Sequence, residues 1–577
     1  MNGGQSIARV LQSHGVKFLF TLCGGHISPI LKSAKDLGIR IVDVRHEATA
    51  VFAADAVARI SGVPGVAAVT AGPGATNTIT AVKNAQLAQS PVVLLGGAAA
   101  TVLKGRGALQ DIDQLALFKP HVKWATAVSR VRDLAPALAK AFRIAQSGVP
   151  GPVFVECPVD LLYDESLIRE WYAASTPKGN GLQDRAVRAY LNYRTKRLFA
   201  GVDETSEVTV SEVAQLTPAT RDIDRAAASI AKAERPVLVV GSQALVDSSQ
   251  AAAVATAIES LGIPVYLSGM ARGLMGAAHP LHRRHQRRKA LREADLVILA
   301  GVPSDFRLDY GRNVRRSACL ISANRSRVDL NRNRRPDIGA SADAGLFLRG
   351  LANKLEAGVS SRWNAWQEQL LSRDADRERE IDTNASLSAE FLNPVSLCRS
   401  IDAGLPDNSV LIADGGDFVG TASYIVKPRK PLTWLDPGVF GTLGCGAGFA
   451  LGASMCYPDH EIWILFGDGS VGYALAEFDT FARHNIPVIA VVGNDAGWTQ
   501  IAREQVKILD DDVGTVLERS DYHEVAAALG GKGILLKHAD QTATCLQEAR
   551  DAAAKNVPVL LNGWLDKTDF REGSLSM

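Results

Sequence analysis

Short apolar segments alternate with helix-like segments along most of the chain. In residues 1–165 this pattern predicts strands at 18–22, 39–44, 66–70, 92–95 and 153–156. The first twenty residues have the periodicity of an amphipathic helix that leads into the first of these strands. Because strands separated by helices normally pair side by side in parallel, we expect a parallel α/β sheet in this region.

Two further blocks repeat the pattern. Strands are predicted at 236–240, 264–268, 296–300 and 319–322 in one block, and at 411–414, 462–466 and 486–492 in the other. The polar stretch 171–217 and the charged helical stretch 351–390 are predicted to be connections. We therefore expect an α/β protein with three parallel-sheet domains at 1–170, 218–350 and 391–565, followed by a C-terminal tail at 566–577.

Composition narrows the class of protein. A chain of 577 residues is too long to fold around a single hydrophobic core, so several domains are expected. Its 63 basic and 61 acidic residues nearly cancel, which argues against general nucleic-acid binding. Its seven cysteines show neither a disulfide framework nor zinc-ligand spacing. Neither a signal peptide nor an apolar run of transmembrane length is evident, so we expect a cytoplasmic protein that does not associate with membranes.

The run Gly467-Asp468-Gly469-Ser470 directly follows a predicted strand, and Asn494 and Asp495 follow the next one. The glycines let the backbone turn sharply and approach a ligand closely. Oxygen ligands at the ends of two neighbouring parallel strands can hold one Mg²⁺ that carries a diphosphate. Taken alone, the four-residue run is better explained as a turn. Its meaning therefore depends on what the rest of the chain supplies.

Near the N-terminus, Glu47 follows a predicted strand and begins a helix of small residues. A structural role, in which the carboxylate favours the helix dipole, is the simplest explanation of this residue alone. The turn Gly72-Pro73-Gly74, which leads to Asn77, joins another strand to a helix with minimal bulk.

These segments together resemble the thiamine-diphosphate enzymes, and most closely their acetolactate synthase-like group. The resemblance covers almost the whole chain and rests on RHEATAVFAADA, TAGPGATNTITAVKNAQLAQSPV, LDPGVFGTLGCGAGFALGA and FGDGSVGYALAEFDTFARHNIPV. It implies a pyrimidine-binding domain, a central Rossmann-like domain and a diphosphate-binding domain. It assigns Glu47 to the N1′ atom of the aminopyrimidine, where a carboxylic acid favours the imino tautomer that removes the thiazolium C2 proton.

The same resemblance assigns the remaining cofactor contacts. By this analogy Leu443 separates the two rings of the cofactor, and the Gly441 carbonyl accepts a hydrogen bond from its amino group. The residues implied to bind thiamine diphosphate are Glu47, Gly72, Pro73, Asn77, Gly415, Gly416, Gly441, Thr442, Leu443, Gly467, Asp468, Gly469, Ser470, Asp495, Gly497 and Trp498.

For Mg²⁺ the resemblance implies side-chain ligands at Asp468 and Asp495 and a backbone carbonyl at Gly497. The family normally has an asparagine where this chain has Asp495, which is a departure from the pattern. Asn494 is the alternative ligand if the register shifts by one residue. A second carboxylate makes the site more negative, which Mg²⁺ tolerates.

Two residues suggest the reaction. His26, in Gly24-Gly25-His26-Ile27, resembles the histidine that handles the substrate hydroxyl proton in benzaldehyde lyase. A lone histidine is more often an ordinary surface or core residue, but an imidazole is well suited to this proton transfer. Gln110 matches a second active-site position of the same enzymes. Both residues are therefore suited to an enzyme that cleaves a 2-hydroxy carbonyl compound.

The central block has a strongly basic stretch. Residues 283–335 contain fifteen Lys or Arg and five Asp or Glu. Such a run is either a solvated face or a site for the phosphates of a nucleotide-bearing substrate. As candidate coenzyme A contacts we name Arg284, Arg307 and Arg325. In 2-hydroxyacyl-CoA lyases and oxalyl-CoA decarboxylases the C-terminal tail closes over coenzyme A, and the tail here contains Phe570 and Arg571.

The leading hypothesis is a lyase that cleaves a 2-hydroxyacyl-CoA to formyl-CoA and an aldehyde or ketone. One alternative is a carboligase or lyase of the acetolactate synthase or benzaldehyde lyase type that does not use coenzyme A. Another is a cofactor-binding scaffold without catalysis. A flavin or adenine nucleotide in the central domain is a further open alternative. The family resemblance implies a homodimer or homotetramer, because different subunits bind the two halves of the cofactor.

Overall fold

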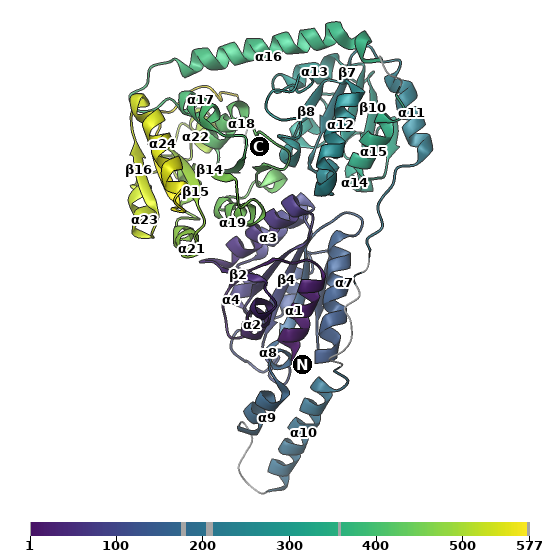
Figure 1. Cartoon of the computed structure of the whole chain (residues 1–577), viewed down its shortest axis with the longest axis vertical. Coiled ribbons are helices and arrows are strands. Elements are labelled where there is room, and N and C mark those ends of the chain that lie inside the picture. The colour runs from purple at the N-terminus through teal and green to yellow at the C-terminus, as the bar shows by residue number, and fades with distance from the viewer. Residues whose placement is uncertain (1, 175–180, 203–209, 211, 356–358, 574–577) are drawn as a thin grey trace. The chain divides into compact units, whose positions relative to one another are not determined.

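The computed structural model of the chain describes residues 2–174, 181–202, 210, 212–355 and 359–573. These residues form two compact units. The first comprises Met1–Ala58 and Val63–Ala214, and the second comprises Arg59–Gly62 and Gln215–Met577. The second unit contains both the central and the C-terminal sheet, so the three predicted domains are distributed over two units (Figure 1).

The first unit is built on a parallel sheet with the strand order β2-β1-β3-β4-β6-β5. β1, β3, β4 and β6 are largely buried, as the sequence predicts for a sheet covered on both faces, whereas the edge strands β2 and β5 are more exposed. The strands are β1 Phe18–Leu22, β2 Arg40–Asp43, β3 Gly65–Val69, β4 Val92–Ala98, β5 Trp124–Ala127 and β6 Val153–Pro158. The helices are α1 Gly3–Ser13, α2 Ser28–Asp36, α3 Glu47–Ser61, α4 Pro73–Thr76, α5 Ile79–Ala88, α6 Gln114–Phe118, α7 Leu134–Gln146, α8 Val159–Leu162, α9 Glu165–Ala174 and α10 Leu182–Phe199.

The central sheet of the second unit is also parallel, with the order β11-β10-β9-β7-β8. Its strands are β7 Pro236–Val240, β8 Val265–Leu267, β9 Leu296–Ala300, β10 Cys319–Ala323 and β11 Ile338–Ala340. The helices of this region are α11 Thr220–Ile230, α12 Ala251–Leu261, α13 Arg287–Glu293, α14 Arg327–Leu330 and α15 Ala344–Ala352.

The C-terminal sheet has the order β13-β12-β14-β15-β17-β16, and all of its pairings are parallel. Its strands are β12 Ser409–Asp414, β13 Trp434–Leu435, β14 Glu461–Gly467, β15 Val488–Asn494, β16 Lys532–Leu536 and β17 Val559–Trp564. The helices here are α17 Pro394–Gly404, α18 Asp417–Ile425, α19 Gly446–Cys456, α20 Asp468–Val471, α21 Glu477–Arg483, α22 Thr499–Leu509, α23 Tyr522–Ala528 and α24 Thr542–Ala553.

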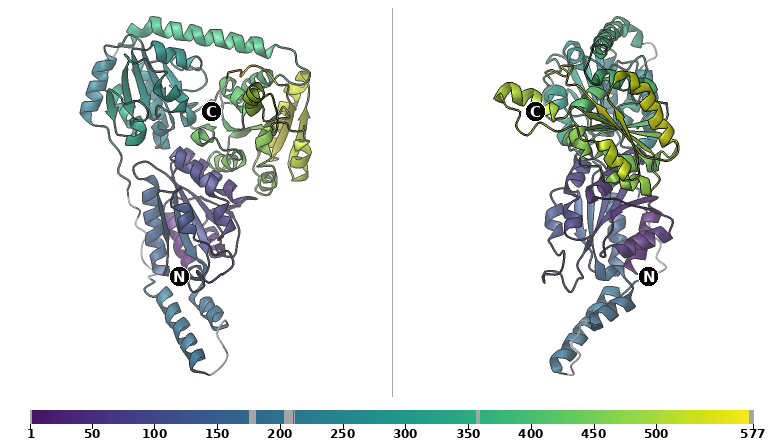
Figure 2. Two further views of the ribbon diagram at one scale, coloured as in Figure 1. Left: turned by 180° about the vertical axis from the view of Figure 1, so that it is seen from behind. Right: turned by 90° about the vertical axis from the view of Figure 1, so that its left-hand side faces the viewer.

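The two stretches predicted to be connections contain long helices. Within 171–217, α10 runs for 18 residues and forms a hairpin with α9 that extends away from the sheet of the first unit (Figure 1). Within 351–390, α16 Asn364–Ala385 spans from the central domain to the C-terminal domain (Figure 2). The buried faces of α10 and α16 are narrow, which is why their sequences look polar.

Candidate active site

Three loops of the first unit meet at the carboxyl ends of neighbouring strands. β1 pairs with β2 on one side and with β3 on the other. The residues that follow β1 include His26, those that follow β2 lead to Glu47, and those that follow β3 form the turn at Gly72. Strand order therefore gathers residues that are far apart in the sequence, and the carboxyl edge of a parallel sheet is where such folds normally bind ligands.

Glu47 is the first residue of α3 and its side chain is buried, with 6% of the residue exposed. The Asn77 Nδ2 donates a hydrogen bond to the Glu47 Oε2 at 3.0 Å. A Cβ at Gly74 would stand 3.7 Å from the Glu47 Oε1, so a glycine leaves this oxygen room. The structure thus brings together Glu47 and Asn77, and within the described residues the Oε1 atom keeps its capacity to bind a ligand.

His26 is held by a residue to which the sequence analysis gave no role. The His26 Nδ1 lies 3.1 Å from the Thr70 Oγ1. The Thr70 side chain is also in close contact with two glycines, since a Cβ at Gly24 or Gly74 would approach it to 2.4 or 2.7 Å. Burial lowers the pKa of His26 below its ordinary value of 6.5. The imidazole is therefore neutral at physiological pH and able to accept a proton.

Gln110 lies against the glycine turn that follows β3. Both Gln110 and Gly72 have positive φ, at 62° and 61°. A Cβ at Gly72 would stand 2.9 Å from the Gln110 Cβ, so this close approach needs a glycine. The structure therefore places Gln110 beside the turn Gly72-Pro73, in the same unit as His26 and Glu47.

The second unit forms another cluster at the carboxyl ends of β12, β14 and β15. In the sheet register Asp414 pairs with Phe466, and Gly467 pairs with Gly493. Asp468, which begins α20, therefore lies close to the residues that follow β15. The Asp468 Oδ2 accepts a hydrogen bond from the Gly497 backbone N–H at 3.0 Å. Burial raises the pKa of the Asp468 carboxyl group.

Asp495 and Asn494 face different surroundings. The Asn494 Nδ2 donates to the Asn562 Oδ1 at 3.2 Å and its Oδ1 accepts from the Ala496 N–H, so this side chain is part of the sheet interior. Burial and the charge of Asp468 raise the pKa of Asp495 to about 7. Two adjacent carboxylates suit a hard divalent cation with oxygen ligands, and this geometry favours Asp495 over Asn494 as a metal ligand.

Asp414 fixes the segment that carries Gly441, Thr442 and Leu443. The Asp414 carboxylate accepts hydrogen bonds from the backbone N–H groups of Gly444 at 3.1 Å and Gly446 at 2.7 Å. Burial raises the pKa of Asp414 to about 7. Leu443 stays partly exposed, and a Cβ at Gly441 would meet nothing within 4 Å. The loop is therefore anchored at one end while Gly441 and Leu443 face open space.

The glycines of this cluster allow close backbone contacts. A Cβ at Gly415 would stand 2.7 Å from the Gly467 nitrogen, and one at Gly469 would stand 2.4 Å from the Trp498 ring. Next to Gly416, the Asp417 carboxylate forms an ion pair with Arg503 at 2.8 Å. Because Arg503 compensates the charge of Asp417, this carboxylate is compatible with a diphosphate nearby. The Ser470 hydroxyl donates to the Asp414 carbonyl, which joins β12 to the turn.

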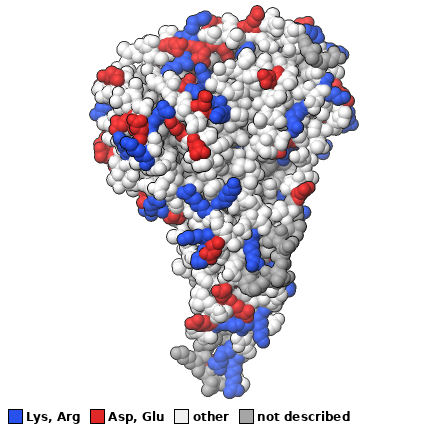
Figure 3. Space-filling view, viewed as in Figure 1, with Lys and Arg blue, Asp and Glu red and all other residues white. Residues whose placement is uncertain are grey.

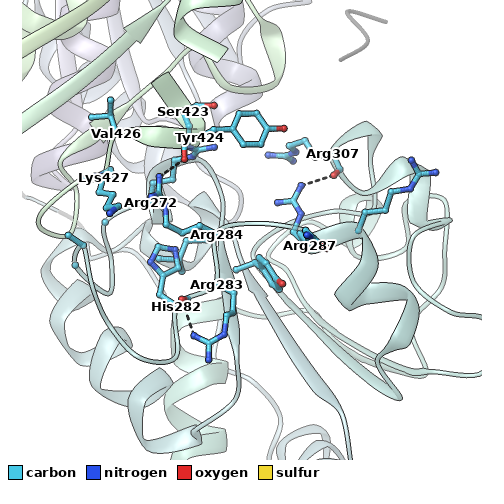
Figure 4. Close-up of a pocket in the computed structure, with 18 of the residues that line it drawn as sticks. Arg272, His282, Arg283, Arg284, Arg287, Arg307, Ser423, Tyr424, Val426 and Lys427 are labelled. Carbon is cyan, nitrogen blue, oxygen red and sulfur yellow. Dashed lines mark hydrogen bonds between the residues drawn. The ribbon is translucent and has the colours of Figure 1, made fainter. Parts of the chain in front are cut away.

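A strongly basic cavity lies between the central domain and the segment that ends α18 (Figure 4). It encloses about 490 Å³. We call it the basic cavity. Its charged or polar lining residues include Arg272, His282, Arg283, Arg284, Arg287, Arg288, Arg307, Asn313, Tyr424, Lys427 and Arg571. Two of the candidate coenzyme A contacts, Arg284 and Arg307, are among them.

The positive charges of the basic cavity are only partly compensated. Arg307 pairs with Asp305 at 2.6 Å and Arg284 approaches Glu378 at 3.4 Å. Arg272 and Arg287, in contrast, donate to the backbone carbonyls of Ser423 and Arg307, at 2.9 and 2.8 Å (Figure 4). Burial lowers the pKa of both arginines, and it lowers the pKa of His282 to about 3. An anionic ligand would relieve this buried positive charge.

Arg325 does not line the basic cavity. Its guanidinium pairs with Asp343 at 2.6 Å, and its backbone N–H donates to the Gln243 Oε1. The structure therefore separates Arg325 from Arg284 and Arg307, with which the sequence analysis had grouped it. Arg272, Asn313 and Lys427 were missed, because isolated residues in loops carry no recognisable pattern.

The described part of the C-terminal tail, residues 566–573, packs on the second unit. The Thr568 carbonyl accepts from the Arg503 Nη2 at 2.6 Å, and the Phe570 ring meets the Tyr424 ring edge to face. The Arg571 side chain lies over Gly420 and lines the basic cavity. The tail thus contributes a cation to the cavity. Residues 574–577 lie outside the described residues.

No described helix combines the length and apolar character needed to cross a bilayer. No group of three or more His, Cys, Asp or Glu side chains with metal-binding geometry occurs in the described residues. Asp468 and Asp495 are two buried carboxylates, and the charge of Asp468 acts on Asp495.

Comparisons with known proteins agree with this geometry. Residues 1–117, 223–351 and 414–562 match the N-terminal TPP binding domain, the central domain and the C-terminal TPP binding domain of thiamine pyrophosphate enzymes. The chain is 51% identical to 2-hydroxyacyl-CoA lyase 2 of Bos taurus, over 100% of this chain and 92% of the relative. It is 49% identical to the protein of the same name in Caenorhabditis elegans, over 100% and 91%. A probable acetolactate synthase of Mycobacterium bovis is 33% identical, over 97% and 95%.

Proposed function

Because the chain belongs to the thiamine pyrophosphate enzymes, we propose that it is a thiamine-diphosphate-dependent lyase acting on 2-hydroxyacyl-CoA. The products would be formyl-CoA and an aldehyde or ketone. The observation that carries the choice of substrate is the basic cavity, where Arg272 and Arg287 have backbone carbonyls rather than carboxylates as partners. The relatives that are 51% and 49% identical to this chain are both named 2-hydroxyacyl-CoA lyase 2, which supports the same choice.

The two clusters fit the two halves of the cofactor. Bound thiamine diphosphate supplies a nucleophilic carbon and an electron sink for carbon–carbon cleavage. Glu47, buried and held by Asn77, would hydrogen-bond the aminopyrimidine through its Oε1 side. Asp468 and Asp495, with the Gly497 carbonyl, would hold Mg²⁺ on the diphosphate, and Asn494 is excluded from our ligand set by its partners in the sheet interior.

His26 is our candidate base for the hydroxyl proton of the substrate. Its Nδ1 is occupied by Thr70, which leaves Nε2 as the nitrogen that makes no hydrogen bond within the described residues. Burial keeps the imidazole neutral, so it can take the hydroxyl proton as the C1–C2 bond breaks. Gln110, beside Gly72, would donate a hydrogen bond to the substrate oxygen.

The phosphates of coenzyme A match the basic cavity in charge. Coenzyme A carries a diphosphate and a further phosphate on its ribose, and multiple guanidinium groups bind such oxygens through paired hydrogen bonds. We assign the phosphates to Arg272, Arg284, Arg287 and Arg307, with Arg571 of the tail closing one side. This assignment drops Arg325, which pairs with Asp343 elsewhere.

The assembly is also a proposal. The Glu47 cluster belongs to the first unit and the Asp468 cluster to the second. We propose a homodimer or a homotetramer in which one copy supplies the first cluster and a partner copy supplies the second. Mixing the inactive variants Glu47→Gln and Asp468→Ala would then restore part of the activity, provided that subunits exchange. Absence of recovery with demonstrated exchange would count against this arrangement.

A direct assay separates the proposed substrate from its main alternative. Purified enzyme with thiamine diphosphate and Mg²⁺ is given a 2-hydroxyacyl-CoA in one reaction and an acyloin in another, and formyl-CoA is followed by mass spectrometry. We expect formyl-CoA to form, and Arg287→Met to raise the KM for the thioester at least tenfold. The control is Arg185→Met, which changes an exposed residue of α10 that does not line the basic cavity. This variant should leave KM unchanged. Rapid acyloin cleavage without formyl-CoA would instead establish the alternative that does not use coenzyme A.

A further inference from the structure

A second, smaller basic site lies in the first unit, at the base of α10. The helix packs against the 3-10 helix Val131–Asp133, and a cleft of about 150 Å³ remains between them. We call it the arginine cleft. Its lining residues are Thr101, Ser129, Arg130, Arg194, Arg197 and Leu198. Three of the six are arginines, two carry hydroxyl groups and none is a carboxylate.

Within the described residues, the charges of the arginine cleft are only partly balanced. The Arg130 Nε pairs with Asp133 at 2.9 Å. Arg194 and Arg197 have no carboxylate within ion-pair distance in the described part of the chain. The Arg194 Nε is buried and has no hydrogen-bond acceptor there. A buried charged donor without an acceptor is destabilising, which points to an acceptor supplied by a ligand.

A buried carboxylate beside the cleft is engaged at one oxygen, while its other oxygen has no hydrogen-bond partner within the described residues. Asp160 lies behind Thr101 and is 1% exposed. Its Oδ2 accepts hydrogen bonds from the Thr101 backbone at 2.9 Å, from the Thr101 hydroxyl at 2.6 Å and from the Tyr172 hydroxyl at 2.7 Å. Even when Asp133 and Asp160 are both counted against the three arginines, the cleft keeps an excess of positive charge.

We propose that the arginine cleft binds a phosphoryl anion. Guanidinium groups present forked N–H donors that match phosphate oxygens, and the Ser129 hydroxyl adds a further donor. The cleft lies wholly in the first unit, whereas the basic cavity lies in the second. The proposal therefore does not depend on the identity of the lyase substrate, and it concerns a separate ligand site.

The phosphoryl group can belong to a small molecule or to an acidic lipid headgroup. The outer face of α10 carries Leu182, Tyr190 and Tyr193, which are 87%, 50% and 61% exposed. Their spacing places them on one side of the helix, with Arg185 and Lys196 alongside. An apolar and aromatic stripe bordered by cations is typical of helices that lie on a membrane surface. Figure 3 shows Lys and Arg side chains at the end of this unit formed by α10.

The test measures phosphate binding to the cofactor-loaded enzyme. Inorganic phosphate is titrated by calorimetry into the unaltered enzyme, into Arg194→Met/Arg197→Met and into the control Arg185→Met/Lys196→Met. The control removes the same two charges from the same helix outside the cleft. We expect the first variant to lose one class of binding site, at least tenfold in affinity, and the control to keep it. Phosphate bound by the basic cavity persists in both.

A second arm uses vesicles of phosphatidylcholine with or without phosphatidic acid, in a sedimentation assay. Loss of phosphate binding in the cleft variant identifies a small-molecule phosphoryl ligand. If the cleft variant instead keeps phosphate binding but no longer binds vesicles that contain phosphatidic acid, the ligand is a lipid headgroup. The proposal would be overturned if the cleft variant bound phosphate like its control and bound phosphatidic acid vesicles like the unaltered enzyme. Circular dichroism and lyase turnover, which we expect to be unchanged in both variants, show that each is folded.

Discussion

Replacement of Thr70 by valine tests whether His26 acts as a positioned base. Valine keeps the shape that packs against Gly24 and Gly74 but removes the oxygen that lies 3.1 Å from the His26 Nδ1. The imidazole then loses the partner that fixes its ring. Thr70 itself is not proposed to touch the substrate, so a lower kcat with a nearly constant KM is the expected signature.

The size of the effect follows from the energy of one hydrogen bond. A neutral hydrogen bond contributes about 0.5–1.5 kcal/mol, so Thr70→Val should lower kcat about 2- to 12-fold. Loss of the base itself is larger, because general base catalysis contributes about 10²–10⁴-fold. We therefore expect His26→Ala to lower kcat by about two to four orders of magnitude. In the double variant the Thr70 change should have no additional effect, since the ring that it positions is absent.

Formyl-CoA production by the four proteins of this cycle provides the assay. The pH profile adds a second readout. Activity requires neutral His26, whose pKa lies below 6.5, so kcat/KM should stay level as pH falls to about 6.5 and decline only below it. His26→Ala should lose this acid limb. The reasoning would be refuted if Thr70→Val lowered kcat by the same factor in the presence and absence of His26.

Three other variants test the two cofactor clusters. Glu47→Gln should nearly abolish turnover with the fold intact, and near-normal activity would contradict the role of Glu47. Asp495→Ala removes one of two adjacent carboxylates and should raise the Mg²⁺ concentration for half-maximal activity at least tenfold, since it removes an oxygen ligand and weakens the attraction for a divalent cation; an unchanged Mg²⁺ titration would argue against Asp495 as a ligand. Gly469→Ala places a Cβ 2.4 Å from the Trp498 ring and should weaken thiamine diphosphate binding, measured by fluorescence titration; unchanged affinity would show that Trp498 moves aside without consequence.

The sheets could be predicted from the sequence because most of their strands are continuous apolar runs. β1, β7 and β9 were predicted with the bounds that the structure gives them. The prediction omitted the edge strands β5, β11, β13 and β16, and it also omitted β17, which is an interior strand. An edge strand buries fewer side chains, so its sequence has a weaker apolar pattern. The hairpin helix α10 was missed as a helix for a related reason.

The candidate site could be predicted from the sequence where a functional side chain comes soon after the end of a strand. Asp468 and Asp495 stand directly after the buried strands β14 and β15, and Glu47 follows the end of β2 after three residues. Parallel pairing brings such positions to one edge of each sheet. Thr70 was overlooked because its role arises only when the turns at Gly24 and Gly74 close around it. Arg325 was grouped with the other arginines by proximity in sequence, whereas its partner Asp343 is set by the tertiary fold.

The division between sheet edges and loops explains how one fold can serve several substrates. Backbone hydrogen bonds and strand order fix Asp414, Asp468 and Glu47, so residues at these positions change little in geometry when loops vary. The basic cavity is built from loops, from the start of α13, from the end of α18 and from the tail, with Arg272 and Arg287 donating to backbone carbonyls. Replacing such arginines removes buried positive charge without breaking a carboxylate ion pair. Substrate selection can therefore change at low cost to stability, while the cofactor clusters remain intact.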